Sequence, residues 1–166
     1  TTTNLEGGYM LHATGSNRRK KREWKDSYSV GVEELDIQHR RLLDLLNDLG
    51  ELAYNQAATG QVAFGALNAM IRYAETHFKA EEGYLEKNGY PQYLAQREEH
   101  KFFIEKAFEM AQDLEDKTTL SLGTIVIYLE DWYTDHILGT DQGYKKFLAL
   151  KMVETTDAAN PGEEKK

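Results

Sequence analysis

Six residues in this chain combine nitrogen and oxygen side chains with a spacing that suits a metal site. They are His39, His77, Glu81, His100, His136 and Asp141. Imidazole and carboxylate groups are ligands that iron and similar transition metals prefer. Four imidazoles and two carboxylates are more than one ion usually takes from a protein. The set therefore favours a pair of ions that the carboxylates bridge.

The spacing within two motifs indicates how helices would position these side chains. His77 and Glu81 are four residues apart, which places both on one face of an α-helix. His136 and Asp141 are five residues apart, which separates them by about 140° around a regular helix. Gly139 lies between them. We expect Gly139 to interrupt the helix and relax the backbone, so that the carboxylate returns to the metal.

The elements that carry these residues are expected to be helices. Apolar residues recur with helical periodicity, and turn-forming residues interrupt the pattern at 59–60, 88–89 and 117–119. Pro91 is expected to open the third helix in its first turn. The expected helices cover residues 34–57, 61–87, 92–115, 120–138 and 141–152. Long helices with short connections predict an all-α fold, an antiparallel up-down-up-down four-helix bundle with a short extra C-terminal helix.

Composition limits the class of protein. A length of 166 residues predicts one domain, and a net charge of −8 argues against a nucleic-acid partner. Cysteine is absent, which excludes disulfides, iron–sulfur clusters and thiol catalysis. No apolar run approaches the roughly 20 residues that span a bilayer, and no secretory signal is visible. We therefore expect a cytoplasmic protein with no membrane segment in this chain.

Three regions are expected: a flexible N-terminal segment or linker over 1–23, the bundle over 24–153 and a polar tail over 154–166. Residues 18–22 are a block of basic side chains. A solvated linker is one interpretation of this block, and a juxtamembrane stretch or a nucleic-acid arm stays open. His12 lies outside any periodic pattern and is interpreted as a bystander. The segment is also compatible with a domain cut from a larger signalling protein.

Taken together, the motifs resemble those of bacterial hemerythrins over residues 24 to about 150. The matching segments are WKDSYSVGV at 24–32, LDIQH at 35–39, HFKAEE at 77–82, GYP at 89–91 and WYTDHILGTD at 132–141, followed by Tyr144. In combination these segments are far more specific than any single pair of ligands.

This resemblance implies a non-haem centre of two iron ions, with a bridging oxo or hydroxo group, that binds O2 reversibly. The implied ligands are Glu81 and Asp141 as bridges, His39 and His77 on the iron whose open position takes O2, and His100 and His136 on the other iron. Nitric oxide and small anions are further candidate ligands of the same centre.

The third helix departs from the family pattern. The family carries two histidines four residues apart there; His100 matches the second, and Gln96 stands in the place of the first. Three roles for Gln96 stay open: weak ligation through its amide oxygen, a hydrogen bond to a water on the metal, or an orientation away from the site. Tyr133 is a second departure, either a phenol that donates a hydrogen bond to bound oxygen or an aromatic that fills space. Tyr144 is a further candidate for weak coordination or hydrogen bonding at the site.

Three functions stay open at this point. The first is an O2-binding di-iron protein for storage, delivery or sensing, which is not an enzyme and which we favour. The second is a di-iron redox enzyme that reduces O2, peroxide or nitric oxide, because the missing histidine leaves both irons with open positions. The third is a structural or interaction bundle that has lost its metal. Bound iron separates the third function from the first two, and an O2 adduct that survives repeated binding separates the first from the second.

Overall fold

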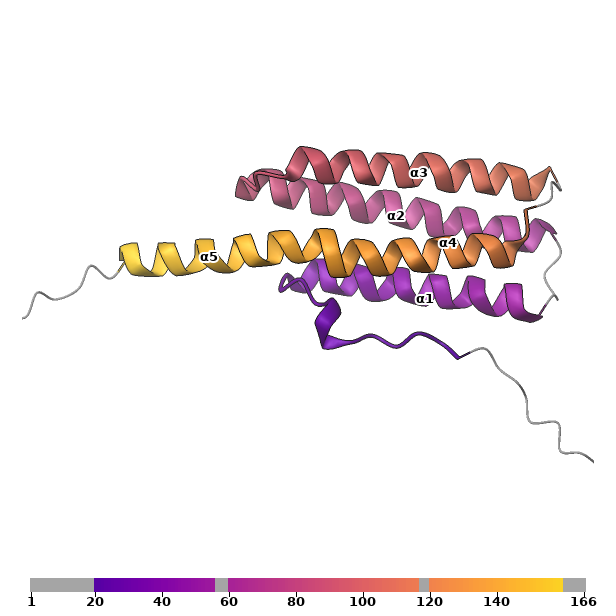
Figure 1. Cartoon of the computed structure of the whole chain (residues 1–166), viewed down its shortest axis with the longest axis horizontal. Coiled ribbons are helices and arrows are strands. Elements are labelled where there is room, and N and C mark those ends of the chain that lie inside the picture. Colours follow the sequence, from indigo (N-terminus) through magenta and orange to yellow (C-terminus); the bar gives the residue numbers. More distant parts are fainter. Residues whose placement is uncertain (1–19, 56–59, 117–119, 160–166) are drawn as a thin grey trace, which may run out of the picture.

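The computed structural model describes residues 20–55, 60–116 and 120–159, and within them the chain is helical apart from short connections (Figure 1). The helices are α1 (Glu33–Asn55), α2 (Gly60–Asn88), α3 (Tyr93–Glu115), α4 (Leu122–Asp135) and α5 (Asp141–Ala159). A 3-10 turn, η1 (Asp26–Tyr28), precedes α1, and a π-helical turn, η2 (His136–Thr140), joins α4 to α5.

Helices α1 to α4 lie side by side as a bundle in which successive helices run in opposite directions (Figure 1). Helix α1 packs against both α2 and α4, and α2 packs against α3. No strand occurs in the described part of the chain. The predicted all-α, up-down-up-down bundle with an extra C-terminal helix is therefore confirmed.

Two apolar clusters hold the helices together. The larger runs through the middle of the bundle and includes Leu42, Leu67 and Ile71, and the smaller lies near the start of α5 and includes Leu35. Full burial of one such side chain contributes roughly 1.5–3 kcal/mol. Along α1, His39 lies between Leu35 of the smaller cluster and Leu42 of the larger. Apolar packing on both sides therefore fixes the position of His39 along the axis of the bundle.

The turn between α2 and α3 uses a glycine that the sequence marks. Gly89 has a φ of 71°, a left-handed conformation that favours glycine. The backbone N–H groups of Gly89 and Tyr90 donate to the carbonyls of Glu86 and Leu85, which satisfies two of the last carbonyls of α2. Helix α3 begins at Tyr93, one residue after its expected start, and Pro91 lies in the turn before it and not in the first helical turn as expected.

Helix α4, η2 and α5 form one continuous rod (Figure 1). The expected interruption at Gly139 is wrong. The backbone N–H of Asp141 donates to the carbonyl of His136, so the chain passes from α4 to α5 through one wide turn without a break. Gly139 does not have a positive φ, and its conformational freedom is not required there. Helix α5 also continues to Ala159, beyond its expected end at residue 152.

Part of the basic N-terminal block contacts the bundle. The backbone N–H of Arg22 donates to Asn47 Oδ1 of α1 at 2.8 Å, and its guanidinium donates to Thr134 Oγ1 of α4 at 3.0 Å. Glu130 Oε2 lies 3.4 Å from the same guanidinium. Residues 1–19, and His12 with them, lie outside the described residues. The division of the chain into linker, bundle and tail stays a prediction.

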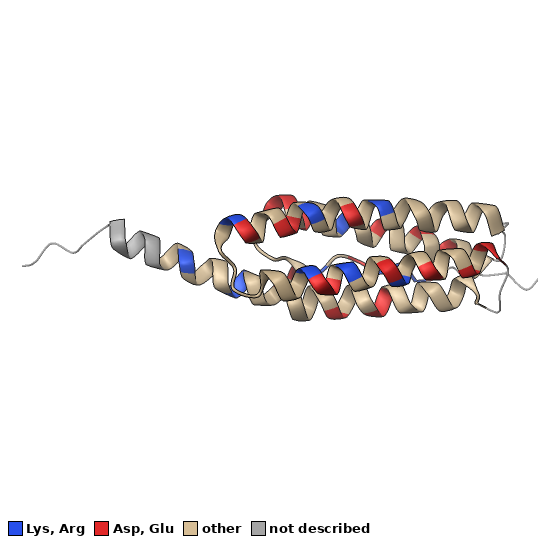
Figure 2. Cartoon of the chain, turned by 90° about the horizontal axis from the view of Figure 1, so that it is seen from above, with Lys and Arg blue, Asp and Glu red and all other residues tan. Residues whose placement is uncertain are grey.

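Charged residues of both signs are interspersed along the visible helices of the bundle (Figure 2). Among the described helices, none is long and apolar enough to cross a bilayer. The cytoplasmic location stays a prediction.

Candidate metal centre

The six predicted ligands meet in the interior of the bundle. Their exposed fractions range from 0% to 4%. The elements that position them are α1 for His39, α2 for His77 and Glu81, α3 for His100, η2 for His136 and α5 for Asp141. Side chains from α1, α2, α3, η2 and α5 therefore converge on one buried polar site. Burying so many polar groups costs free energy unless each finds a partner.

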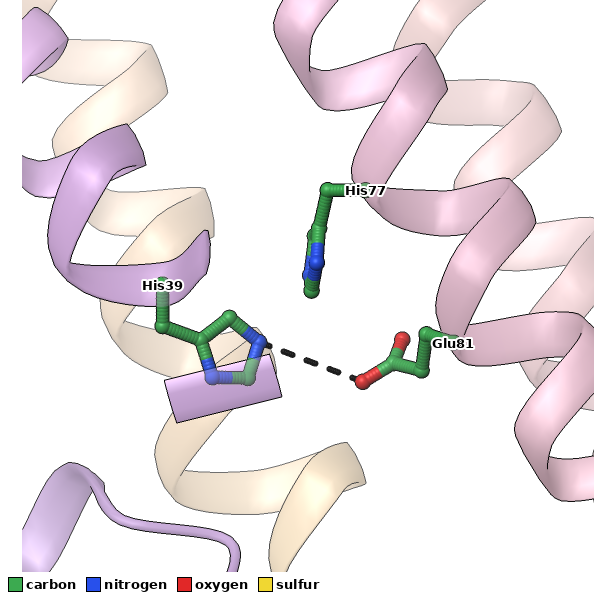
Figure 3. Close-up of side chains that lie close together, drawn as sticks. All are labelled: His39, His77 and Glu81. Atoms are coloured by element: carbon green, nitrogen blue, oxygen red, sulfur yellow. Dashed lines mark ion pairs between the residues drawn. The ribbon is translucent and has the colours of Figure 1, made fainter. Parts of the chain in front are cut away.

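The potential ligand atoms form two groups that share Glu81. In one group, His39, His77 and Glu81 present ligand atoms within 4.8 Å of one another, and Figure 3 shows these side chains from α1 and α2 directed toward each other. In the other, Glu81, His100 and His136 meet the same limit. The Nε2 atoms of His100 and His136 are 3.0 Å apart. Each group combines two imidazoles with a carboxylate, a donor set suited to a transition metal.

Both buried carboxylates extend between the two groups. Glu81 Oε1 lies 3.9 Å from His39 Nε2, and Glu81 Oε2 lies 3.2 Å from His100 Nε2. Asp141 Oδ2 lies 3.5 Å from His39 Nε2, and Asp141 Oδ1 lies 3.2 Å from His136 Nε2. Each carboxylate therefore turns one oxygen toward each group, an arrangement that suits a bridging ligand.

The π-helical turn sets the register of the last motif. In a regular α-helix, residues five apart would lie about 140° from each other. A π-helical turn bonds residue i to residue i+5, so the side chains of His136 and Asp141 stack on one face of the rod. The sequence correctly indicated that the backbone departs from a regular α-helix here. The form of the departure is an extra residue in a continuous helix, and such turns often occur at functional sites.

Two imidazoles are oriented by side chains from a neighbouring helix. His77 Nδ1 is 2.9 Å from Gln38 Oε1, and His100 Nδ1 is 2.9 Å from Glu82 Oε1. Both partner oxygens can accept a hydrogen bond from Nδ1, which leaves each Nε2 directed at the interior of the site. Partners of this kind fix the tautomer and the ring orientation of histidine ligands.

A further carboxylate, which sequence reasoning missed, lies close to a ligand histidine without forming a hydrogen bond to it. Glu99 Oε2 lies 3.4 Å from His136 Nδ1 and accepts a hydrogen bond from Thr140. Each of the three partners is the chain neighbour of a ligand but reaches the histidine of the next helix. Glu82, for example, adjoins Glu81 yet contacts α3. A polar residue beside each predicted ligand was the available signal, but its target depends on how the helices pack.

The two tyrosines named as candidates have different contacts. Tyr144 is fully buried and donates a hydrogen bond to Glu81 Oε1 at 2.7 Å. Burial and the nearby Glu81 carboxylate raise the pKa of Tyr144 well above its usual range, so its hydroxyl stays a donor. Tyr133 donates to the backbone carbonyl of His39 at 3.0 Å. That bond uses the only hydrogen of the phenol, which favours a packing role for Tyr133 over donation to a bound ligand.

Gln96 points into the site. Its side chain is 1% exposed, and Nε2 donates to Asp141 Oδ1 at 2.9 Å and to Glu81 Oε2 at 3.1 Å. Its oxygen is buried without a hydrogen-bond partner among the described residues. An orientation away from the site, one of three roles considered from the sequence, is therefore excluded. The amide is part of the buried polar cluster.

Burial keeps three histidines of the site, His39, His77 and His136, neutral near pH 7. Burial lowers the pKa of His39 to about 4 and that of His77 to about 3, despite the nearby Glu81 carboxylate. Burial also lowers the pKa of His136. Neutral imidazole is the form that binds metals. Near pH 7 these ligands therefore need to lose no proton before they coordinate.

The two carboxylates share a buried negative charge. Burial acts to raise the pKa of Glu81, but the hydrogen bond with His100 and the nearby imidazoles outweigh it and lower that pKa below its usual range. Burial and the adjacent Glu81 carboxylate raise the pKa of Asp141 well above its usual range. The opposite shifts reflect the repulsion between two adjacent buried carboxylates. A bound cation would relieve that repulsion.

Several buried atoms have the chemistry of ligands that lack an ion. His39 Nε2 and Asp141 Oδ2 have no hydrogen-bond partner among the described residues. An unsatisfied buried polar group costs about 1–3 kcal/mol. Nitrogen and oxygen donors directed at a common interior, with no cysteine in the chain, fit iron better than a zinc site built on thiolates. The residues present therefore fit the metal pair implied by the sequence.

The fold and the site define a class: a four-helix bundle with a buried, carboxylate-linked pair of histidine groups. Residues 30–148 match the family model described as "Hemerythrin HHE cation binding domain". This match covers most of the chain, and the protein belongs to the hemerythrin family.

Related proteins of known name agree with this assignment. A bacteriohemerythrin of Stenotrophomonas maltophilia is 30% identical over 129 residues, which are 73% of this chain and 77% of the relative. A bacteriohemerythrin of Clostridium acetobutylicum is 27% identical over 124 residues, which are 73% of this chain and 96% of the relative. A crystal structure of a hemerythrin point mutant is 25% identical, with a TM-score of 0.68 over 75% of this chain and 95% of that chain.

Proposed function

We propose that this chain is a non-haem di-iron protein that binds O2 reversibly. One observation carries the proposal: Glu81 and Asp141 each turn one oxygen toward each of two histidine groups. This geometry suits two ions at bridging distance better than one ion. Membership of the hemerythrin family supports the same assignment.

The residues of the site would have different roles in binding the two ions. Two histidines would hold each ion, His39 with His77 and His100 with His136, and Glu81 and Asp141 would bridge the pair. When bound, the iron pair supplies the two electrons that O2 binding requires. Tyr144 holds Glu81 through its hydroxyl, and it stays protonated because its pKa is raised.

Aromatic side chains enclose the second histidine group. Phe78 stacks on His100 with ring centroids 3.9 Å apart, and Trp132 stacks on His136 at 4.3 Å. Leu42 and Phe103 line a small apolar cavity next to these rings. Such walls exclude water and protons, which favours reversible O2 binding over irreversible reduction of O2, a reaction that consumes protons.

The test combines iron analysis with spectroscopy. The chain is loaded with Fe²⁺ without air, its iron content is measured, and absorption spectra are recorded before O2, after O2 and after O2 removal. The proposal expects about two irons per chain and a new visible band that disappears when O2 is removed. An iron content near zero, or a spectrum that does not return to that of the reduced protein, would contradict it.

A redox enzyme is the second candidate, and Gln96 is the observation that favours it. An amide in the place of an imidazole leaves the His100 and His136 side with fewer strong ligands. Sustained O2 consumption with an external reductant, at many turnovers per chain, would support the enzyme. Consumption that stops after one equivalent supports the O2-binding protein.

A further inference from the structure

Gln96 contacts the two carboxylate oxygens that face the second histidine group. These are Asp141 Oδ1, 3.2 Å from His136 Nε2, and Glu81 Oε2, 3.2 Å from His100 Nε2. The amide nitrogen of Gln96 donates to both of them. A histidine at the same place would direct a ring nitrogen at the ion, whereas Gln96 uses its donors on the carboxylates.

The orientation of the amide follows from the chemistry of its neighbours. Two carboxylate oxygens accept hydrogen bonds, so the NH2 group must face them and the carbonyl oxygen must face away. Turning the oxygen toward the carboxylates would exchange two hydrogen bonds for two repulsive contacts. The oxygen of Gln96 is buried and has no hydrogen-bond partner among the described residues. It is therefore available to accept a hydrogen bond from a small ligand.

We propose that Gln96 is a positioning residue that holds Glu81 and Asp141 and leaves an exchangeable ligand position on the His100 and His136 side. The inference rests on the proposed di-iron function and adds a second open position to it. Each ion then has two imidazoles, and water or a small anion takes the place of the imidazole that the family carries at position 96. Each carboxylate oxygen has two lone pairs, so it can accept from Gln96 and still ligate an ion.

A groove between α2 and α3 reaches the His100 side of the site. Its volume is about 520 Å³, many times the roughly 30 Å³ of one water molecule. The groove reaches His100 and Phe78, and its lining carries three basic side chains, from Lys79, Arg97 and Lys101, and four carboxylates, from Glu75, Glu82, Glu98 and Glu105. Azide is a small anion that coordinates ferric iron, so it is a suitable probe of the position.

The experiment counts azide ions bound to the ferric protein by calorimetry, after its iron content has been measured. The wild-type chain is expected to bind about two azide ions, one for each open position, and Gln96→His about one. Gln96→Met has a similar size but no donor and only a weakly accepting sulfur, so it should still bind about two. Gln112→His adds an imidazole on the exposed face of α3 and serves as the matched control, with the wild-type count expected.

The Gln96→Met variant tests whether Gln96 positions the two carboxylates or only lacks an imidazole. Because the carboxylates lose their common donor, iron affinity is expected to fall about tenfold or more, as for other partners of metal ligands. Unchanged affinity would show that Gln96 does not position the carboxylates. Equal azide counts in the wild type and Gln96→His would overturn the second open position while leaving the proposed function intact.

Iron content distinguishes failure of the inference from failure of the function. A wild-type chain with one iron, rising to two in Gln96→His, would show that the amide displaces the second ion and would overturn both. The contact itself is tested without metal, by NMR of the Gln96 side-chain amide. Slow exchange of its protons with solvent is expected, and fast exchange would contradict the hydrogen bonds to Glu81 and Asp141.

Discussion

Glu81 and Glu82 are adjacent and carry the same functional group, yet their surroundings give them different chemistry. Glu81 is fully buried, contacts both histidine groups and accepts a hydrogen bond from Tyr144. Glu82 is partly exposed and accepts from the outer nitrogen of His100. The rotation of about 100° between neighbours on a helix accounts for the difference. One carboxylate is placed to bind the ions, and the other to orient an imidazole.

Alanine substitutions at these two positions should therefore have unequal effects. Glu81→Ala removes a ligand of both ions and should abolish binding of the iron pair. Glu82→Ala should keep the pair at saturating iron but weaken affinity about 10–100-fold, because it removes only the partner of a ligand. Iron content and binding isotherms of both variants measure this. Two irons per chain in Glu81→Ala would contradict the bridging role.

At the residue scale, the sequence predicted where the ligands would converge but not what surrounds them. Two signals were sufficient to predict this convergence: the i,i+4 spacing of His77 and Glu81, and the resemblance of short segments to the family motifs. Both can be read from neighbouring residues in the chain. The contact between Glu82 and His100 depends on the packing of two helices, and no local pattern encodes it. The orientation of Gln96 also had to be observed, because an amide can donate or accept.

The lowered histidine pKa values predict acid sensitivity of the metal-free chain. His77 has a pKa of about 3 in the folded chain against 6.5 when unfolded, so the unfolded chain binds more protons between these values. Stability is then lost as pH falls below about 6.5, by about 2 kcal/mol between pH 7 and pH 5 for this histidine. Asp141 acts in the opposite sense, because its raised pKa lets the folded chain keep a proton.

Urea unfolding of the metal-free chain at pH 7 and pH 5 measures this effect. The His77→Leu variant isolates it, because this variant should lose less free energy of unfolding on acidification than the wild type by about 2 kcal/mol. Equal losses in the two proteins would show that His77 is not kept neutral by burial.

At the element scale, helices were easier to predict than the joints between them. Apolar periodicity placed α2 and α3 within a residue of their observed ends, because burial of one face decides such segments. Gly139 was misinterpreted because glycine often ends a helix, whereas here it lies within a π-helical turn. The five-residue spacing of His136 and Asp141 was the better signal, since it equals the hydrogen-bond spacing of that turn.

Single-residue deletions should distinguish the wide turn from a regular helix. Deleting the exposed Leu138 leaves His136 and the aspartate four apart, which a regular α-helix places on one face, so the iron pair should be retained. Deleting the exposed Lys79 changes the relative orientation of His77 and Glu81 by about 100° within α2. That variant should lose iron. Helix content by circular dichroism and iron analysis are the measurements, and iron loss in both variants would contradict the role of the turn.

At the scale of the whole molecule, each loop links two consecutive helices, whereas the site brings side chains from α1, α2, α3, η2 and α5 into contact. Neighbours of the ligands contact the histidine of the next helix from α1 to α2, from α2 to α3 and from α3 to η2. The Nδ1 atom of His39 on α1 has no such partner among the described residues. Arg22 instead connects α1 to α4 at the surface. The sequence predicted the bundle. It did not predict which ligand neighbour contacts which histidine, because these contacts form only when the helices pack.

Because α1, α2, α3 and the continuous rod of α4, η2 and α5 each contribute a ligand, binding of metal should stabilise the entire bundle and not one segment. A ligand that binds only the folded chain adds about 2.7 kcal/mol at a free concentration 100 times its dissociation constant. For a chain of this size that corresponds to a rise of about 5–10 °C in Tm. Thermal unfolding followed at 222 nm, with and without Co²⁺ as an air-stable substitute for Fe²⁺, measures the shift.

Two histidine variants complete this last prediction. His100→Ala removes a ligand of α3 and should lose most of the rise in Tm, because the second histidine group then keeps one imidazole. His12→Ala serves as the control, since His12 lies outside the helical pattern, and it should keep the full rise. The unfolding transition of the loaded wild type should remain a single step at the higher temperature, because the ions connect all the helices. A loaded protein in which part of the helix content melts at the metal-free Tm would show that the site does not hold the bundle together.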